Sequence, residues 1–268
     1  MKHPVVSVII PTYNREAFIC RAIDSVRTQT FNDWELIIVD DASSDKTESV
    51  INNYDDNRII SIKHNKNFGP AIARNTALKR AKGRYIAFLD SDDFWCSRNK
   101  LKTQIGILMN SSNRVGCVYS QTCQFKNEKK LYFPKENIKK KEGFLYKSLS
   151  RCQYFIHLSS VVIKKEVLDR VGYFDENIPA TAELDVWLRI SKNYSFCYVN
   201  QCHVHSFFTP GSISTKRFLR AKAMVLILKK HRKDLSKDIF SLYMFFSHIM
   251  RFVLAGILIK LKLKKSIQ

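Results

Sequence analysis

Three carboxylates follow a short apolar segment in the first third of the chain. The segment Tyr85–Leu89 has the composition of a buried strand and leads directly into Asp90, Asp92 and Asp93. Carboxylates this close repel one another unless a cation lies among them, and hard cations such as Mg²⁺ and Mn²⁺ prefer oxygen ligands. Two alternate carboxylates at a strand end also leave coordination positions for phosphate oxygens and water. The spacing predicts a divalent-metal site, and a solvated acidic turn is the alternative.

The elements that would position these carboxylates form an alternating series of strands and helices. Apolar runs predict strands at 5–10, 34–39, 58–63 and 85–89, and helical patterns lie between them at 15–27, 45–54 and 71–81. Such alternation favours an α/β fold with a mostly parallel, Rossmann-like central sheet flanked by helices, whose ligands bind beyond the carboxyl ends of the strands. Asp40, Asp41, Asp90, Asp92 and the turn at Pro11 would share that edge. We expect a nucleotide-phosphate and metal site there, although neither Gly-x-Gly-x-x-Gly nor a Walker sequence is present.

The middle of the chain gives weaker signals. After a predicted helix at 97–109 and strand at 115–120, the lysine-rich stretch Lys126–Lys147 is either a solvated loop or hairpin, or a surface for an acceptor or lipid phosphate. A strand is predicted at 158–163 and a helix at 164–170. A helix begins at Ala182, and Glu183 and Asp185 in its first turn either complement the helix dipole or serve a site. A strand follows at 194–199, and His203 and His205 would point to one side of it, as a metal pair or as packing residues.

Basic residues are concentrated at the C-terminal end. The whole chain has 45 Lys and Arg against 24 Asp and Glu, and residues 216–268 have fourteen against two. Helices are predicted at 218–230 and 239–264, and polar residues such as Ser241, His248 and Arg251 interrupt the apolar run of the second. This composition favours a tail that binds anionic lipid peripherally, with packing onto the rest of the chain or a membrane span as alternatives. Nucleic acid is not an expected partner, because no nucleic-acid motif accompanies the charge.

The cysteines predict free thiols. Their number is seven and no Cys-x-x-Cys spacing occurs, which argues against both a disulfide framework and a zinc site. A chain of 268 residues also needs no disulfide to hold its core. The apolar run at 5–10 is too short for a secretory signal and stops at Pro11. We therefore expect a cytoplasmic protein, peripheral on the inner face of the cell membrane.

In these features the chain resembles the glycosyltransferases of family 2, inverting enzymes of GT-A fold that use nucleotide-sugars. Ordered motifs between about residues 4 and 215 carry the resemblance: Val8–Asn14, Ile38–Asp45, Gly69–Asn75, Leu89–Asp93, and Gly172–Glu176 followed by Asp185–Arg189. The resemblance implies a GT-A catalytic domain over 1–215, with a nucleotide-binding part over about 1–95 and an acceptor-binding part over about 96–215. Residues 216–268 would form a basic amphipathic helical tail.

The resemblance also implies which residues hold the donor. Pro11, Thr12 and Tyr13 would line the base and ribose. Asp41 would accept a hydrogen bond from the base, and Arg74 would reach the nucleotide as a planar donor. Uracil N3–H is a donor that cytosine lacks, and guanine presents donors too, so UDP is favoured without excluding GDP.

The metal is implied at the Asp-x-Asp pair. Asp90 would face ribose or metal-bound water, and Asp92 would face the metal, Mn²⁺ or Mg²⁺. The cation would bridge the diphosphate and stabilise the charge that develops as the nucleotide leaves.

The catalytic base is implied at Glu183. In the family an Asp, commonly preceded by Glu, lies ahead of an Asp-x-Trp helix and takes the proton of the attacking acceptor hydroxyl. Asp185 and Trp187 match that pattern, which puts Glu183 at the base position and Ala182 where Glu often stands. Unless the backbone compensates, the longer side chain shifts the carboxylate by about 1 Å, which can lower a rate about 100-fold.

A second departure from the family lies at Thr209. Many relatives have Tyr-Arg-x-His before Pro-Gly-Ser-x-Ser, and the histidine helps to bind metal or diphosphate. Thr209 holds that position here. Because a threonine hydroxyl is a poor metal ligand, water or a nearby histidine could substitute, and the sequence leaves this contact open.

The sequence therefore predicts a metal-dependent inverting hexosyl- or N-acetylhexosaminyl-transferase. Its donor would be a nucleotide-sugar, with UDP favoured. Its acceptor would be a hydroxyl of a growing cell-surface glycan, of O-antigen (lipopolysaccharide) or capsule type, on a polyprenyl carrier. Transfer to polyprenyl phosphate itself is one alternative. A non-catalytic, membrane-associated nucleotide-sugar-binding protein is the other, prompted by Glu183 and Thr209.

Overall fold

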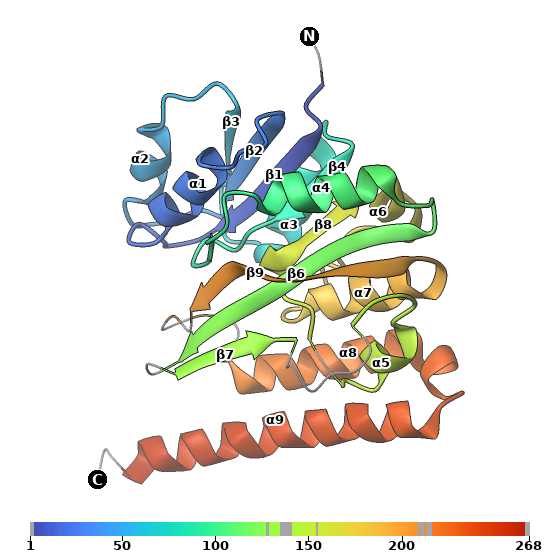
Figure 1. The fold of residues 1–268 in the computed structure, drawn as a ribbon. Coiled ribbons are helices and arrows are strands. Elements are labelled where there is room, and N and C mark those ends of the chain that lie inside the picture. The colour runs from blue at the N-terminus through green and yellow to red at the C-terminus, as the bar shows by residue number, and fades with distance from the viewer. Residues whose placement is uncertain are drawn as a thin grey trace.

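A single nine-stranded sheet runs through the protein, flanked by helices (Figure 1). The computed structural model describes residues 3–126, 129–134, 141–153, 155–207, 209, 212 and 216–265. Its strands are β1 (Val6–Thr12), β2 (Trp34–Asp40), β3 (Ile59–Lys63), β4 (Tyr85–Phe88), β5 (Phe94–Trp95), β6 (Val115–Lys126), β7 (Lys129–Phe133), β8 (Val161–Lys164) and β9 (Ser195–Phe207). Its helices are α1 (Ile19–Arg27), α2 (Thr47–Asn52), α3 (Pro70–Arg80), α4 (Lys100–Asn110), α5 (Tyr146–Ser150), α6 (Lys165–Val171), α7 (Ala182–Asn193), α8 (Arg217–Leu235) and α9 (Ile239–Lys265), with one 3-10 turn, η1 (Leu158–Ser160).

The first half of the sheet is parallel, as the alternating pattern predicts. Strands β3, β2, β1 and β4 pair in that order and all in parallel. Every residue of β1 is buried because helices cover both faces. Ile9 belongs to the cluster that contains α3, while Val8 and Ile10 belong to the cluster that contains α1 and α4. The carboxyl ends of β1, β2 and β4 therefore lie side by side at one edge.

Beyond β4 the sheet is mixed. Strand β8 is antiparallel to both β4 and β6, β9 runs parallel to β6, and the short β5 is antiparallel to β9. Strands β6 and β9 extend well past the predicted segments 115–120 and 194–199, because pairing between strands, rather than apolar alternation, continues the ladder. The lysine-rich stretch begins as a hairpin between β6 and β7, and residues 127–128 and 135–140 of it lie outside the described residues.

The predicted strand at 158–163 is wrong for its first half. Residues Leu158–Ser160 form the turn η1, and β8 begins at Val161. The Ser159 hydroxyl donates to Asp93 Oδ2 at 2.6 Å, and the Ser160 hydroxyl donates to the carbonyl of His157 at 2.7 Å. Serine hydroxyls that bond locally compete with a strand ladder, so the two serines favour a turn here.

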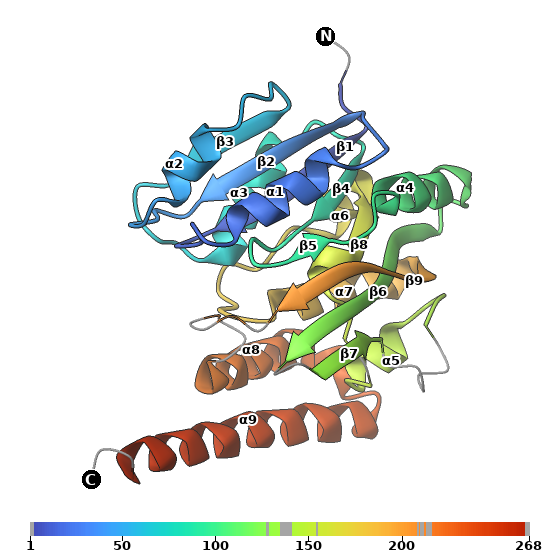
Figure 2. The ribbon, with the colours of Figure 1, turned by 60° about the vertical axis from the view of Figure 1, so that its left-hand side comes forward.

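The two C-terminal helices pack against the rest of the protein and against each other. Helix α8 contributes Ala223 and Ile227 to the core cluster that also holds α7, although the predicted domain boundary near residue 215 stays a prediction. Helix α9 lies along α8 in both views (Figures 1 and 2) and buries Phe245 and Phe252. Among the described helices, α9 alone is long and apolar enough to cross a membrane, judged by length and composition over Ile239–Ile259.

The turn before β4 brings its backbone against β1. Ser7 Oγ donates to Glu35 Oε1 at 2.6 Å and accepts from the Gly83 amide at 2.8 Å, and both polar side chains are buried. A Cβ atom on Gly83 would lie 2.4 Å from the Ser7 nitrogen and 2.7 Å from the Val6 carbonyl carbon. Only glycine fits without a backbone shift, so this contact fixes where β4 begins and where Asp90 follows.

Replacing Gly83 with alanine should lower the free energy of unfolding by about 2–3 kcal/mol, because the backbone of β1 must move to make room. Gly106→Ala is the matched control: a Cβ there meets nothing within 4 Å inside α4, so alanine should be neutral or stabilise by up to about 1 kcal/mol. Urea denaturation measures both changes. Equal stability of the two variants would contradict the proposed steric constraint.

Candidate functional site

A cavity of about 840 Å³ opens at the carboxyl ends of β1, β2 and β4. The structure brings together around it the eight residues for which the resemblance implies a role: Pro11, Thr12, Tyr13, Asp41, Arg74, Asp90, Asp92 and Glu183. They come from the end of β1, the turn after β2, α3, the turn after β4, and the first turn of α7. Their convergence follows from the parallel register of the first four strands and the packing of α7. Asp40, which the sequence predicts at the same edge, is buried, accepts from the Ser43 amide at 3.0 Å and does not line the cavity.

Asp93 differs in its surroundings from Asp90 and Asp92. Asp93 is buried, and its Oδ2 bonds to Ser159 Oγ at 2.6 Å. Burial raises the pKa of Asp93 well above its usual range, and the charges of Asp90 and Asp92 raise it further. A raised pKa favours the uncharged form of Asp93, which lessens the repulsion that the sequence predicts.

Asp90 and Asp92 each keep one carboxylate oxygen available. Asp90 Oδ1 accepts from Arg74 Nη2 at 2.7 Å. Asp92 Oδ2 accepts from Thr209 Oγ1 at 2.5 Å and lies 3.9 Å from Arg15 Nη2. Within the described part of the chain, Asp90 Oδ2 and Asp92 Oδ1 accept no hydrogen bond. Two such oxygens at the cavity wall, on residues with one position between them, can ligate a hard divalent cation.

His157 lines the same cavity, and sequence reasoning did not name it. Its Nε2 lies 3.2 Å from Ser206 Oγ, while its buried Nδ1 has no hydrogen-bond partner among the described residues and lies 3.7 Å from Asp93 Oδ2. Burial lowers the pKa of His157 despite the nearby carboxylates, so the imidazole is neutral near pH 7 and can offer a lone pair. No motif marks this residue; only the fold brings it beside the carboxylates.

Asp41 orders the loop that closes one side of the cavity. Its Oδ1 accepts from the Phe68 amide at 3.0 Å and lies 2.7 Å from His64 Nδ1, and its Oδ2 accepts from the Gly69 amide at 2.7 Å. Gly69 has a φ of 94°, which glycine adopts readily, and Pro70 then begins α3. Asp41 thus holds the entry to α3 and still lines the cavity with a carboxylate oxygen.

Two motifs far apart in the sequence meet beside Arg74. The Asn75 side chain accepts from the Phe174 amide at 3.1 Å and donates to the Phe174 carbonyl at 2.9 Å. The Arg74 guanidinium lies 5.5 Å from the centre of the Phe174 ring. The segments Gly69–Asn75 and Gly172–Glu176 therefore hold each other in place, and Arg74 is positioned to contact Asp90.

Glu183 lies half-buried in the first turn of α7, after Thr181 in a left-handed conformation with φ of 50°. Burial raises the pKa of Glu183, while the charges of Arg74 and Arg220 oppose that rise. A carboxylate whose pKa is raised toward neutrality is better suited to take a proton at cellular pH.

Asp185 anchors the same turn and does not line the cavity. It is completely buried, with Oδ1 2.8 Å from His231 Nε2 and Oδ2 accepting from Arg189 Nε at 3.0 Å and Lys230 Nζ at 3.2 Å. Burial alone would raise its pKa, but the hydrogen bond from His231 and the charges of Arg189 and Lys230 lower it to about 2. Since His231 and Lys230 belong to α8, this network fixes α7, and with it Glu183, against α8.

Comparisons with known proteins agree with the geometry. Residues 7–172 match the family described as Glycosyl transferase family 2. The chain is 34% identical over 222 residues to a protein named as a teichuronic acid biosynthesis glycosyltransferase, TuaG of Bacillus subtilis, covering 82% of this chain and 85% of that one. It is 34% identical over 223 residues to the UDP-Glc:alpha-D-GlcNAc-diphosphoundecaprenol beta-1,3-glucosyltransferase WfaP of Escherichia coli, covering 80% and 81%.

Solved structures show the same fold at lower identity. TarS 1–349 of S. aureus in complex with UDP-GlcNAc gives a TM-score of 0.67 at 21% identity, and the match covers 83% of this chain and 65% of that fragment. The mannosyltransferase PcManGT of Pyrobaculum calidifontis, in complex with GDP-Man and Mn²⁺, gives 0.64 at 20% identity, covering 100% and 81%. These likenesses confirm the predicted α/β fold of GT-A type, with a C-terminal helical addition.

Replacing Asp185 with asparagine should destabilise the protein by about 3–5 kcal/mol at pH 7, because it removes the charge of a fully buried carboxylate that ties Arg189 of α7 to Lys230 of α8. Asp185 is charged in the folded state to lower pH than when unfolded, so its contribution is present above about pH 4 and is lost as the pH falls toward 2. Urea denaturation at several pH values should show the difference between wild type and Asp185→Asn shrinking in that range. Asp169→Asn, which breaks an exposed pair with Lys165, is the control and should cost less than about 0.5 kcal/mol.

Proposed function

The chain belongs to glycosyl transferase family 2, and from this premise we propose that it transfers a sugar, with inversion, from a UDP-sugar to a hydroxyl of a cell-surface glycan on a polyprenyl diphosphate carrier. The observation that carries the proposal is the single cavity that holds the Asp90–Asp92 pair, Arg74 and Glu183. WfaP, whose name specifies a UDP-Glc donor and a diphosphoundecaprenol-linked acceptor, supports the choice of substrate classes. We assign the activity to the domain predicted over about 1–215 together with α8, which packs against it, and within the predicted tail 216–268 we assign membrane binding to α9.

In this proposal the donor nucleotide binds at the ends of β1 and β2. Tyr13 is 43% exposed at the cavity, so its ring is available to stack on the base beside Pro11 and Thr12. Asp41 Oδ2, which accepts one amide, has a second lone pair for uracil N3–H. Arg74 turns one amino group to Asp90 and has others for the nucleotide.

The donor set around Asp90 and Asp92 fits Mn²⁺ or Mg²⁺. Asp90 Oδ2 and Asp92 Oδ1 would supply carboxylate oxygens, and His157 Nδ1 would take the place of the family histidine that Thr209 replaces. Thr209 instead orients Asp92 through its hydroxyl. When bound, the cation offsets the negative charge of the departing diphosphate.

Glu183 is proposed as the base that takes the proton of the acceptor hydroxyl. That hydroxyl attacks the anomeric carbon from the side opposite the diphosphate, which inverts the configuration. Lys216, just before α8, and Arg220, in the first turn of α8, line the same cavity. Their positive charges suit the diphosphate of a lipid-linked acceptor.

The exposed side of α9 supports peripheral binding to an anionic membrane. An apolar stripe with helical spacing faces outward, namely Tyr243, Phe246, Met250, Leu254 and Leu258, each at least half exposed. Phe218 packs against Gly256, and the Arg220 guanidinium lies 4.5 Å from the centre of the Phe252 ring. The later turns of α9 therefore adjoin the beginning of α8, beside Lys216 and Arg220, so a lipid-bound α9 would bring the carrier near Glu183.

The proposed chemistry predicts separate defects for donor binding and transfer. With UDP-sugars and Mn²⁺, the wild type should hydrolyse one donor slowly and lose that activity in EDTA. Asp92→Ala should lose metal-dependent hydrolysis, whereas Glu183→Gln should bind UDP normally but turn over about 10²–10⁴-fold more slowly, the range for a lost general base. Since burial raises the pKa of Glu183, the acid limb of the pH–rate profile should lie above pH 4.5.

A matched control is Glu166→Gln, because Glu166 is an exposed acidic residue in the first turn of α6. This variant should turn over at the rate of the wild type. Full turnover by Glu183→Gln would remove Glu183 from the mechanism. UDP binding without any hydrolysis or transfer by the wild type would favour a non-catalytic binding protein, and no binding of UDP or GDP, measured by calorimetry, would reject the proposed site.

Membrane association predicts that Phe246→Asp, Met250→Asp and Leu254→Asp together weaken binding to anionic phosphatidylglycerol vesicles by more than about 100-fold, since each substitution removes roughly 1.5–3 kcal/mol of apolar burial. The three residues are 54–57% exposed, so the fold should persist, which circular dichroism checks. Met109→Asp on α4, at a methionine that is 58% exposed, is the control and should bind like the wild type. Vesicle sedimentation that is unchanged in the triple variant would rule out this face as the anchor.

A further inference from the structure

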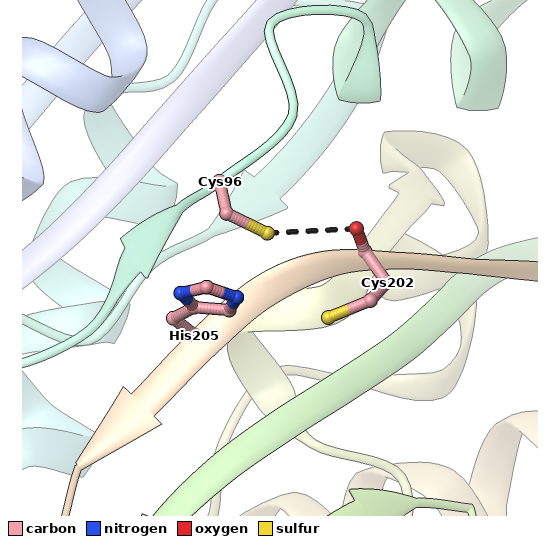
Figure 3. A group of neighbouring side chains, drawn as sticks. All are labelled: Cys96, Cys202 and His205. Atoms are coloured by element: carbon pink, nitrogen blue, oxygen red, sulfur yellow. Dashed lines mark hydrogen bonds between the residues drawn. The ribbon is translucent and has the colours of Figure 1, made fainter.

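Cys96, Cys202 and His205 converge beside the ladder between β5 and β9 (Figure 3). Cys96 directly follows β5, and the other two residues lie on β9. The two sulfur atoms and one ring nitrogen of His205 all lie within 4.8 Å of one another. The side chains point toward a common space, and the Cys96 thiol donates to the carbonyl of Cys202 at 3.5 Å.

A β-bulge explains why two residues three apart on β9 share one side. In the register with β6, Cys202 pairs with Gln121, and Val204, not His203, pairs with Thr122. The extra residue shifts the alternation, so the register puts Cys202 and His205 on the same face. His203 falls on the other face, fully buried, with its Nε2 3.0 Å from Gln201 Oε1. The sequence expectation that His203 and His205 point the same way is therefore wrong.

The neighbouring strand brings a further thiol to this face. Cys123 on β6 pairs directly with His205 and is fully buried. Three adjacent strands, β5, β9 and β6, thus contribute to one cluster. A Cys-x-x-Cys search cannot detect it, because Cys96, Cys123 and Cys202 are far apart in the sequence.

This set of side chains matches the chemistry of tetrahedral zinc. Thiolate sulfur and imidazole nitrogen bind Zn²⁺ at about 2.3 and 2.0 Å, which puts ligand atoms about 3.5–3.8 Å from one another. Side-chain rotations that close the cluster by about 1 Å would meet that geometry. The ring of His205 is held edge-on by Phe94 and Phe125, with centroids 5.2 and 4.9 Å away.

We propose that Cys96, Cys202 and His205, with Cys123 as the fourth ligand, bind one zinc ion that ties β5 to β9 and β6. This site is distinct from the Asp90–Asp92 pair, which offers hard oxygen ligands to a different class of cation. A bound zinc ion would hold two segments that form the wall of the cavity. Strand β5 begins two residues after Asp92, and the chain leaving β9 carries Thr209, which bonds to Asp92. Zinc would fix both connections.

Cobalt substitution tests the proposal without any sugar donor. The full-length protein, reduced and freed of metal, is titrated with Co²⁺ and its visible absorption is recorded. One equivalent should give the intense bands of tetrahedral thiolate-bound Co²⁺, and one equivalent of Zn²⁺ should abolish them. Cys96→Ser should weaken binding by more than about 100-fold, beyond the 10–100-fold typical of groups that only orient a ligand. Cys96 is exposed, so this variant should fold, and zinc should raise the melting temperature of the wild type but not of Cys96→Ser.

Two controls separate this site from the others. Asp92→Ala should keep the cobalt spectrum, and so should Cys20→Ser, which changes an exposed cysteine on α1. If the spectrum is lost in Asp92→Ala but kept in Cys96→Ser, the ion binds at the carboxylate site, and the proposal is overturned. Absence of thiolate bands in the reduced protein would overturn it too, as would a Cys96–Cys202 disulfide in protein alkylated directly in cell lysate. None of these readouts depends on glycosyl transfer, so failure here leaves the proposed function untouched.

Discussion

Like-charge repulsion at the end of β4 is the constraint on which the arrangement of the cavity depends. Three carboxylates within four residues can coexist only if each has its own environment. Asp93 turns inward to Ser159, where burial raises its pKa, Asp90 pairs with Arg74, and Asp92 bonds to Thr209. The partners come from η1, α3 and the chain after β9. The sheet order, in which β8, β6 and β9 follow β4 and bring these segments back, is thus required to place two charged oxygens at the cavity.

The C-terminal helices are part of the same arrangement. Asp185 can be buried as a charge only because His231 and Lys230 of α8, together with Arg189, surround it. That network sits two residues after Glu183, so the position of the proposed base depends on a helix that lies beyond every motif of the family. Residues 216–235 are therefore expected to be necessary for the catalytic domain, whereas α9, which leaves one side exposed, can serve a separate partner.

How far the sequence predicts the structure depends on the range of the interaction. The parallel strands, the helices between them and the cavity edge follow from local periodicity, and the eight residues with a role implied by the resemblance line one cavity. His157, the turn η1 and the bulge in β9 do not follow, because each is set by a partner from elsewhere in the chain: Ser206 for His157, Asp93 for Ser159, and β6 for β9. The Pro-Gly-Ser-x-Ser motif after Thr209 lies largely outside the described residues, which include only Ser212 of its defining positions.

One face of β9 carries soft ligand groups, the thiols and the imidazole, whereas the cavity carries hard carboxylate oxygens. Strand β9 ends at Phe207, and the Arg21 guanidinium lies over both the Phe207 and Phe94 rings, at 4.3 and 4.8 Å, while donating to the Asp92 carbonyl at 3.0 Å. This aromatic and cationic layer separates the thiols from the carboxylates. A cation that binds oxygen, before β5, and one that binds sulfur, after β5, can therefore be neighbours without competing, since ligand softness and not distance decides which ion each site accepts.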